Sequence, residues 1–477
     1  MTTIASERRD DDITRTLSEH LLGLEFGDLP AGVVDTTKLY TLECVAHMIS
    51  AQAQSVSRIV RDYLRALDAS PQALVVGTGL RTSVAEAAYA NGTSAHADEL
   101  ESHGTLPGTG LVPPIAAAIT VADWRKGVDG KSFVSAIVAG VEMQGRLGAA
   151  GIGACDRGFM GISLVGPGAA AVTSARLLGL DVGQLQHALG IALPLSNGST
   201  RGCGYMTHVH EAGVPTRTGV FAAQMAAAGF TGCPNYLDGA HSWGEQFAGD
   251  ARRPYRAEAL TERLGETFFL ETCDVAPKQF GSCGLTHQTI EGTIDLMRDH
   301  GLQPGDIERV VLVVPPWADR IASFREPENG EQAKFSIRQG VAALLVDGVP
   351  PLPYLRPFSD ETCNDPRYVA ARSRVELRVE EGGENQRGFA HQVVTLHLVD
   401  GRAVSREVDH ALVRGHVANP FTVDDRLDMV RNTVERIGVD RTEWLIEGLM
   451  DIEHRKLDDV VAVLETIAVD VEFSSST

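Results

Sequence analysis

The sequence predicts a mainly α protein, with a large all-helical domain built from both chain ends and a smaller α+β lid domain. Apolar residues recur at three- and four-residue spacing through most of the first 230 residues and again after residue 424. Between these regions, after Asn235, short runs of alternating apolar and polar residues are typical of strands. At 477 residues the chain is also too long for one simple core.

The first helical region is predicted to hold a series of helices separated by turns that contain glycine or proline. These helices are expected over residues 13–24, 33–52, 56–67, 84–97, 114–124, 133–147, 169–178, 182–193 and 215–229, with a short strand over 73–76. Three polar, glycine-rich segments near residues 104, 155 and 205 interrupt the series. Because packed helices leave functional groups to their connections, we expect these three segments to converge.

Residues 269–408 are predicted to form the lid domain. Helices are expected over residues 286–300 and 336–345, and strands over 310–314, 375–379, 392–398 and 403–408. Asp400–Gly401 is a hairpin turn signal between the last two strands. Helical periodicity returns over residues 424–437 and 444–467, so residues 409–477 are expected to complete the helical domain begun by residues 1–268.

The formal net charge of −21 argues against nucleic acid and against anionic membrane surfaces as partners. Seven cysteines are widely spaced without a CxxC pair, which predicts neither a disulfide framework nor a metal cluster. The N-terminus has no apolar signal region, and no run of about 18 apolar residues predicts a membrane span. A reduced, cytoplasmic setting is expected.

Residues 91–114 concentrate ionisable side chains between two Ala-rich helical patterns. His96, Glu99 and His103 follow i, i+3, i+7 spacing, which would place them on one helix face, with Asp98 and Glu101 beside them. The Gly/Pro-rich residues that follow cannot continue a helix. This pattern predicts the floor of a site for a small polar ligand; a solvated, charged helix face is the alternative.

Four stretches resemble the MmgE/PrpD family, and the resemblance covers most of the chain. They are NGTSAHADELE, GFMGISLVGPGAAAVTSARLLGLD, GYMTHVHEAGVPTRTGVFAAQMAAAGFTG and APKQFGSCGLTHQTIEG. The resemblance implies a large helical domain with an α+β lid, and a homodimer without metal or organic cofactor. It also implies small di- or tricarboxylate substrates, and proton abstraction next to a carboxylate followed by loss or return of a group.

The chain departs from the family pattern at several expected site positions. Leu106 stands where the family has the histidine of a His-Pro pair, Met160 where it often has histidine, and His208 where it has lysine. Glu99 matches the family's aspartate, and His103 is a candidate replacement for the missing imidazole. The scaffold is therefore retained, whereas the reacting groups are partly replaced.

Four residues are candidate catalytic groups. Lys278 precedes an aromatic-Gly-Ser-Cys turn, where its ammonium could hold a carboxylate or stabilise an enolate; a solvated hinge lysine is the alternative. His208 could carry protons at neutral pH, unless it is a loop histidine bonded to the backbone. His103 oriented by Glu99 could serve as a second base, unless the two form a surface pair.

A further set of residues is expected to contact a substrate, each with a structural alternative. Arg217 could pair with a carboxylate or bridge a dimer interface, and Asp98 could cap a helix. Ser282 and Cys283 could contact substrate or pack, while His287 could fix the turn that precedes it. Met160 is the sixth candidate for a substrate contact. His96 is instead expected to be a buried histidine whose ring nitrogens have hydrogen-bond partners.

The function hypothesis is a cofactor-independent lyase, of dehydratase or decarboxylase type, that acts on a small carboxylate-containing, polycarboxylate-like substrate. An epimerase or isomerase of a small dicarboxylate is the first alternative. The HxHE sequence at residues 208–211 allows a second alternative, a metal-dependent hydrolase using His208 and His210, although no third ligand is evident. The third alternative is a non-catalytic descendant that kept the scaffold. No metal and no cofactor are expected.

Overall fold

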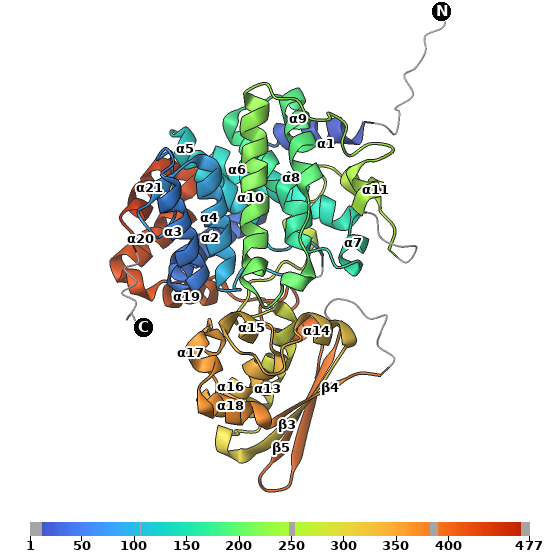
Figure 1. Cartoon of the computed structure of the whole chain (residues 1–477), viewed down its shortest axis with the longest axis vertical. Helices are drawn as coiled ribbons and strands as arrows, with labels where there is room; N and C mark the ends of the chain where they lie inside the picture. The colour runs from blue at the N-terminus through green and yellow to red at the C-terminus, as the bar shows by residue number, and fades with distance from the viewer. Residues whose placement is uncertain (1–11, 105, 248–252, 382–389, 469–477) are drawn as a thin grey trace, which may run out of the picture.

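The computed structural model describes residues 12–104, 106–247, 253–381 and 390–468. It is mainly α, as predicted, with a large helical lobe and a smaller α+β lobe (Figure 1). One hydrophobic core is formed by residues from 17–275 and 430–467, and a second by residues from 280–398 together with Cys203. The predicted domain boundaries after residues 268 and 408 stay predictions.

The helical lobe consists of helices from both ends of the described chain. Its N-terminal helices are α1 (Ile13–Gly23), α2 (Ala31–Ser50), α3 (Ser55–Leu67), α4 (Val84–Ala97), α5 (Val112–Arg125), α6 (Gly130–Ala150), α7 (Gly153–Asp156), α8 (Gly161–Leu178), α9 (Val182–Ala192), α10 (Met206–Ala227) and α11 (Trp243–Phe247). Its C-terminal helices are α19 (Val423–Thr433), α20 (Val439–Met450) and α21 (Leu457–Glu465). The predicted strand at 73–76 is β1 (Ala73–Leu74), which pairs with β2 (Arg81–Thr82).

The centre of the helical lobe is a close packing of α4, α5, α6, α8 and α10. Small residues make this possible: a Cβ on Gly92 of α4 would meet Gly213 of α10, and one on Gly140 of α6 would meet Thr173 of α8. α8 has the length and apolarity of a membrane span, but 78% of that window is buried inside the protein, as in a core helix. The Ala- and Gly-rich composition therefore brings whole helices into near contact.

Two helices begin before residues 169 and 215, where the sequence analysis starts them, and this corrects it. α8 begins at Gly161 and continues through Pro167, and α10 begins at Met206 and continues through Pro215. A proline in a helix leaves the carbonyl four residues earlier without its usual donor. Here the backbone N–H of Asn197 donates to Ser163 O, and Ser163 Oγ donates to Glu211 O at 2.7 Å. These tertiary donors replace the two missing helical hydrogen bonds.

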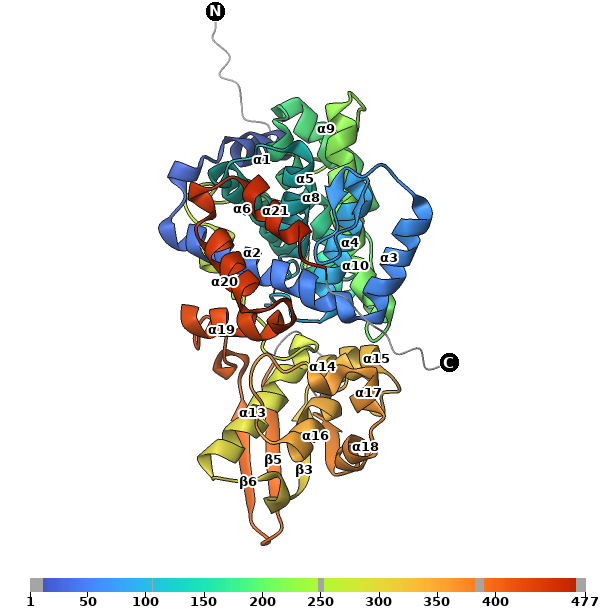
Figure 2. The ribbon, with the colours of Figure 1, turned by 90° about the vertical axis from the view of Figure 1, so that its left-hand side faces the viewer.

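Of the C-terminal helices, α19 and α20 pack against α2 and α21 packs against α5 (Figure 2), and together they close the helical lobe. Arg426 of α19 donates from Nε and Nη2 to the two carboxylate oxygens of Glu43 in α2, at 2.7 and 2.8 Å. Its guanidinium also lies 4.4 Å from the ring centroid of Tyr40. A buried bidentate pair with a stacked ring fixes orientation as well as position. The predicted helix over 444–467 is divided between α20 and α21.

The smaller lobe contains a four-stranded sheet in the order β4-β3-β5-β6. Its strands are β3 (Ile307–Val314), β4 (Val375–Val379), β5 (Gln392–Leu398) and β6 (Ala403–Val408), and its helices are α13 (His287–Asp299), α14 (Pro316–Ile321), α15 (Gly330–Lys334), α16 (Ile337–Asp347), α17 (Asp360–Cys363) and α18 (Pro366–Ser373). The short helix α12 (Phe269–Thr272) precedes this lobe and packs against α6 and α2 of the helical lobe. β3 pairs in parallel with β4, and the other pairs are antiparallel. Alternate residues of β5 are buried where α13 packs on it, as the alternating pattern predicts.

Gly148 provides a test of this close packing next to the loop before α5. An added Cβ would overlap the Pro107 carbonyl oxygen, so Gly148→Ala should lower the free energy of unfolding by about 1–3 kcal/mol despite the better helix propensity of alanine. Gly32→Ala in α2 meets nothing within 4 Å and is the matched control, expected to be neutral or slightly stabilising. Urea unfolding measures both; equal effects would contradict the packing argument.

Candidate active site

A cavity of about 280 Å³ lies where the two lobes meet. Its wall includes residues from 96–110, 152–162 and 200–208 of the helical lobe and from 278–285 at the entry to the smaller lobe. Trp317, Ile321 and Phe335 of the smaller lobe complete it. The three glycine-rich segments therefore converge as expected, together with the turn that carries Lys278.

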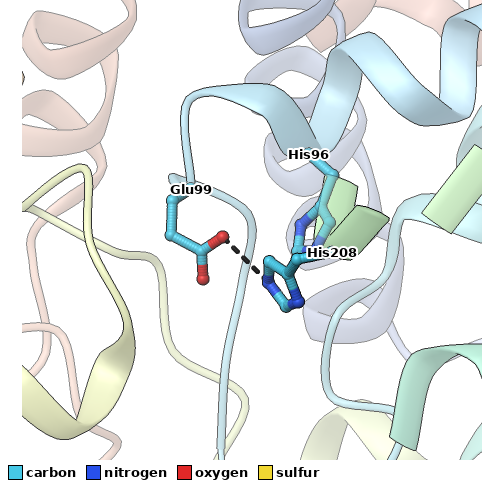
Figure 3. A group of neighbouring side chains, drawn as sticks. All are labelled: His96, Glu99 and His208. Carbon is cyan, nitrogen blue, oxygen red and sulfur yellow. Dashed lines mark hydrogen bonds and ion pairs between the residues drawn. The ribbon is translucent and has the colours of Figure 1, made fainter. Parts of the chain in front are cut away.

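The buried carboxylate of Glu99 is the centre of the polar part of this wall. Its Oε2 lies 3.1 Å from Nε2 of His208 (Figure 3), and its Oε1 accepts a hydrogen bond from Nζ of Lys278 at 2.9 Å. The three residues come from the segment after α4, from α10, and from the turn before α13. Three distant parts of the chain thus supply one ion-paired group.

The helix geometry predicted for this region is wrong. α4 ends at Ala97, and Glu99 adopts φ 54°, in the left-handed region, so His96, Glu99 and His103 do not form a stripe along one helix. A non-glycine residue at positive φ is held there by its surroundings. For Glu99 these are the His96 carbonyl, which accepts its N–H at 3.1 Å, and the two partners of its carboxylate.

A second carboxylate, Glu101, completes the network and was not among the predicted site residues. It accepts a hydrogen bond from Lys278 Nζ, and its Oε2 lies 2.9 Å from Nδ1 of His96. Residues i and i+2 do not face each other on a helix, so a helical interpretation of this segment separated Glu101 from Glu99. The chain leaves the helix at Ala97, and both carboxylates reach the same ammonium. The paired glutamates of DELE were the available signal.

The network keeps its members charged despite burial. Burial alone would raise the pKa of Glu99, but Lys278 and His208 hold that pKa well below its usual range. Burial would lower the pKa of Lys278, but Glu101 and Glu99 outweigh it and raise that pKa. In the same way Glu101 and Glu99 outweigh burial and raise the pKa of His96. Lys278 is therefore a permanent cation whose hydrogen bonds go to two carboxylates.

His103 lines the cavity, but in a different environment from the one predicted. Its backbone N–H donates to Ala276 O at 2.9 Å, and its ring lies 5.4 and 5.6 Å from the rings of His287 and His410. Burial and the neighbouring His287 and Lys278 hold the pKa of His103 well below its ordinary value. The Glu99 carboxylate contacts His208, and Glu99 does not lie on one helix with His103, contrary to the sequence analysis.

The predicted substrate-binding residues divide into two groups. Met160 and Cys283 line the cavity, and burial raises the pKa of the Cys283 thiol to about 12, so it is not a ready thiolate nucleophile. Asp98 and Arg217 are not part of the cavity wall. Asp98 accepts a hydrogen bond from Gln54 at 2.7 Å, and Arg217 pairs with Glu86 at 2.7 Å with half its side chain exposed.

Ser282 and His287 stabilise the turn rather than line the cavity. Ser282 Oγ and Thr286 Oγ1 are 2.8 Å apart, and Nε2 of His287 donates toward the carbonyl oxygens of Phe280 and Ser282 at 3.2 and 3.3 Å. Burial lowers the pKa of His287 to about 3, so the ring is neutral with its proton on Nε2. The structural alternative considered for His287 therefore agrees with the geometry.

The HxH metal alternative is not supported in its predicted form. His208 and His210 diverge because they are two residues apart on α10, and Nδ1 of His210 lies 3.0 Å from the Tyr89 hydroxyl. Ligand atoms of His96, Glu99 and His208 instead lie within 4.8 Å of one another (Figure 3). Those donor types would suit a transition metal, but the Lys278 ammonium competes for Glu99.

Two family models identify the family to which a chain with this two-lobed fold belongs. The MmgE/PrpD N-terminal domain matches residues 15–255, and the MmgE/PrpD C-terminal domain matches residues 280–451. The chain belongs to the MmgE/PrpD family.

Individual relatives are similar at low identity along most of their length. Cis-aconitate decarboxylase of Homo sapiens is 25% identical over 458 residues, which cover 92% of each chain. Cis-aconitate decarboxylase of Aspergillus terreus is 22% identical over 495 residues, covering 97% of each. A cis-aconitate decarboxylase-like protein of Aspergillus oryzae is 28% identical over 318 residues, covering 62% of this chain and 64% of the relative.

Removal of the central cation tests the network. Lys278→Met should lower the free energy of unfolding at neutral pH by about 3–5 kcal/mol, because it leaves two buried carboxylates without their shared partner. The double variant Lys278→Met/Glu101→Gln should recover part of this loss. Denaturant unfolding at pH 7 measures all three proteins. A double variant no more stable than the single one would contradict the charge-pairing argument.

A pH test concerns Glu291 of α13, which accepts a hydrogen bond from Gln279 beside Lys278. Burial and Asp295 raise the pKa of Glu291 to about 7. A carboxyl with a raised pKa in the folded protein stabilises it below pH 4.5 and loses that contribution as pH rises to 7. Between pH 4.5 and 8, the free energy of unfolding of Glu291→Gln should therefore rise by about 3 kcal/mol relative to that of the native protein. Unfolding across pH, with the exposed Glu308→Gln as control, measures this; parallel pH profiles would contradict it.

Proposed function

We propose that the protein is a cofactor-independent lyase, of dehydratase or decarboxylase type, that moves a proton at a carbon next to a carboxylate or carbonyl. The observation that carries this proposal is the buried Glu99–His208 pair on the wall of the inter-lobe cavity. Family membership and the decarboxylase names of the relatives support the lyase class. The low identities do not define the particular reaction, which is therefore argued from the residues of the site.

His208 is the proposed proton carrier. Because Glu99 is ionised it can only accept, so Nε2 of His208 carries the proton of that hydrogen bond and Nδ1 is the nitrogen proposed to exchange the reacting proton. This division of roles follows the logic of an acid that fixes the tautomer of a catalytic histidine and stabilises its imidazolium form. Nδ1 lies 3.9 Å from Sγ of Cys203, which also lines the cavity.

Both reaction types use this one carrier. In a dehydration Nδ1 would take the proton next to the carboxylate or carbonyl, and the electrons of that C–H bond would form the C=C bond as the C–O bond breaks. The imidazolium would return that proton to the departing hydroxide, which leaves as water. In a decarboxylation carbon dioxide would leave, and the electrons of the breaking C–C bond would stay on the adjacent carbon. His208, protonated beforehand at Nδ1 by solvent, would supply the proton to that carbon. Glu99 would stabilise the imidazolium in either case.

Lys278 is proposed as a positioning group rather than the direct anchor suggested by sequence. Its ammonium is bound by Glu99 and Glu101, and its side chain is 3% exposed. It therefore has little capacity left for a substrate carboxylate. Its proposed task is to keep Glu99 ionised, so that the carboxylate continues to orient His208.

Epimerisation remains the second candidate because one observation favours it. His103 and His208 both line the cavity, and proton exchange on opposite faces of one carbon needs two carriers. The cytoplasmic setting and homodimer expected from sequence also stay proposals. Elemental analysis of the purified protein distinguishes a metal-dependent hydrolase, and absence of any exchange activity would indicate a non-catalytic scaffold.

The proton carrier is tested by deuterium exchange into candidate hydroxy acids in heavy water, followed by proton NMR. His208→Gln should reduce the exchange rate 10²- to 10⁴-fold, since glutamine cannot carry a proton. His210→Gln, the same change two residues along α10 on a half-exposed ring, is the matched control and should retain the rate. A His208→Gln protein that is folded and fully active would refute this role.

A further inference from the structure

The cavity is lined mainly by apolar side chains away from its polar network. From the helical lobe these are Leu106, Ile152, Phe159, Met160 and Ile162, and the smaller lobe adds Trp317 and Phe335. Leu106 and Met160 occupy the two positions where histidine was expected from the family resemblance. The described wall therefore offers apolar contact over most of its area.

The charges of the described wall do not favour a polyanion. Its cationic side chains are Lys278, Arg253 and His96, and its carboxylates are Glu99, Glu101 and Asp156. His96 is already paired with Glu101. Lys278 is already bound by two of these carboxylates. The low pKa of His103 keeps that ring neutral. A second or third substrate carboxylate would enter this space without a matching cation, and an unpaired buried charge is costly.

Arg253 is the described wall cation that remains accessible. Its side chain is 37% exposed, and Nε lies 3.6 Å from Asp156, a looser contact than the 2.9 Å pair within the network. A guanidinium has five N–H donors and binds a carboxylate in a bidentate manner. An arginine that is loosely paired and partly exposed can bind one carboxylate, while the apolar wall accommodates the rest of the molecule.

We propose that the substrate is a small monocarboxylate with an apolar chain, its carboxylate held by Arg253 and its chain packed against Met160 and the neighbouring apolar wall. This inference rests on the proposed lyase function and narrows it. It also departs from the di- and tricarboxylates implied by the family resemblance. The shortage of unpaired cations and the apolar side chains at two positions both indicate the same property. The cavity accepts less negative charge than a di- or tricarboxylate carries.

Three β-hydroxy acids that differ in carboxylate number provide the test: citrate with three, malate with two and 3-hydroxyhexanoate with one. Each contains the same hydroxyl two carbons from a carboxylate. Binding is measured by ligand-detected NMR, and chemistry by deuterium uptake in heavy water. The expected result is binding of 3-hydroxyhexanoate at least tenfold tighter than that of malate or citrate, with exchange following the same order.

The outcomes separate this inference from the proposed function. Preferred binding of 3-hydroxyhexanoate without exchange in any acid would support the cavity argument and count against the lyase. Faster exchange into malate or citrate than into 3-hydroxyhexanoate would overturn the monocarboxylate inference and would still support the proposed lyase function. Equal binding of all three acids, or no binding of 3-hydroxyhexanoate, would also overturn it.

Two variants test the individual contacts. Arg253→Gln should weaken 3-hydroxyhexanoate binding at least tenfold, whereas Arg256→Gln, at an exposed arginine that pairs with Glu258, should not. Met160→Lys adds a cation to the apolar wall and should shift preference toward malate, whereas Met206→Lys, at an exposed methionine outside the described cavity wall, is the control and should not. Arg253→Gln without effect, in a protein whose unfolding is unchanged, would refute the anchor. An unshifted preference in Met160→Lys would refute the charge argument.

Discussion

The arrangement of the site depends on the buried carboxylate of Glu99, which is shared between an ammonium and an imidazole. Lys278 and His208 lie 179 and 109 residues from it in sequence, so their contacts with Glu99 connect the turn before α13, α10 and the end of α4. Buried charges persist only when they are paired and hydrogen-bonded. The pairing keeps Glu99 ionised, and an ionised Glu99 fixes the tautomer of His208.

The helical lobe provides the rigidity that such a pairing needs. Gly92 and Gly213 allow α4 and α10 to approach closely, which brings the segment after α4 within reach of His208. α10 continues through Pro215 because Ser163 of α8 donates to the carbonyl of Glu211. His208 therefore lies on a helix supported by its neighbour. A reacting group on a supported helix keeps its geometry better than one on a loop.

The polar and apolar parts of the cavity have separate consequences. The Glu99, Glu101, Lys278 and His96 network is nearly self-neutralising, so it can hold a proton carrier in place without drawing on a substrate. Met160 and Leu106 place apolar side chains in the wall at two positions where the family resemblance implies histidine. Family membership thus describes the scaffold and supports the lyase class broadly, while the proposed substrate rests on the side chains that face the cavity.

Sequence periodicity alone determined the class of fold, most helices, the strands of the smaller lobe and the convergence of the glycine-rich segments, because helix and strand periods are local properties. The family resemblance and the chemistry of the ionisable side chains, rather than periodicity, selected Glu99, His208 and Lys278. Periodicity failed for Pro167 and Pro215, whose lost helical bonds are replaced by donors from other segments, and it separated Glu101 from Glu99 by assuming a helix beyond Ala97. Only the tertiary structure decided that Arg217 faces Glu86 and that His287 fixes a turn. An ion-pair or hydrogen-bond partner is set by which distant segments meet, and a local pattern contains no record of that.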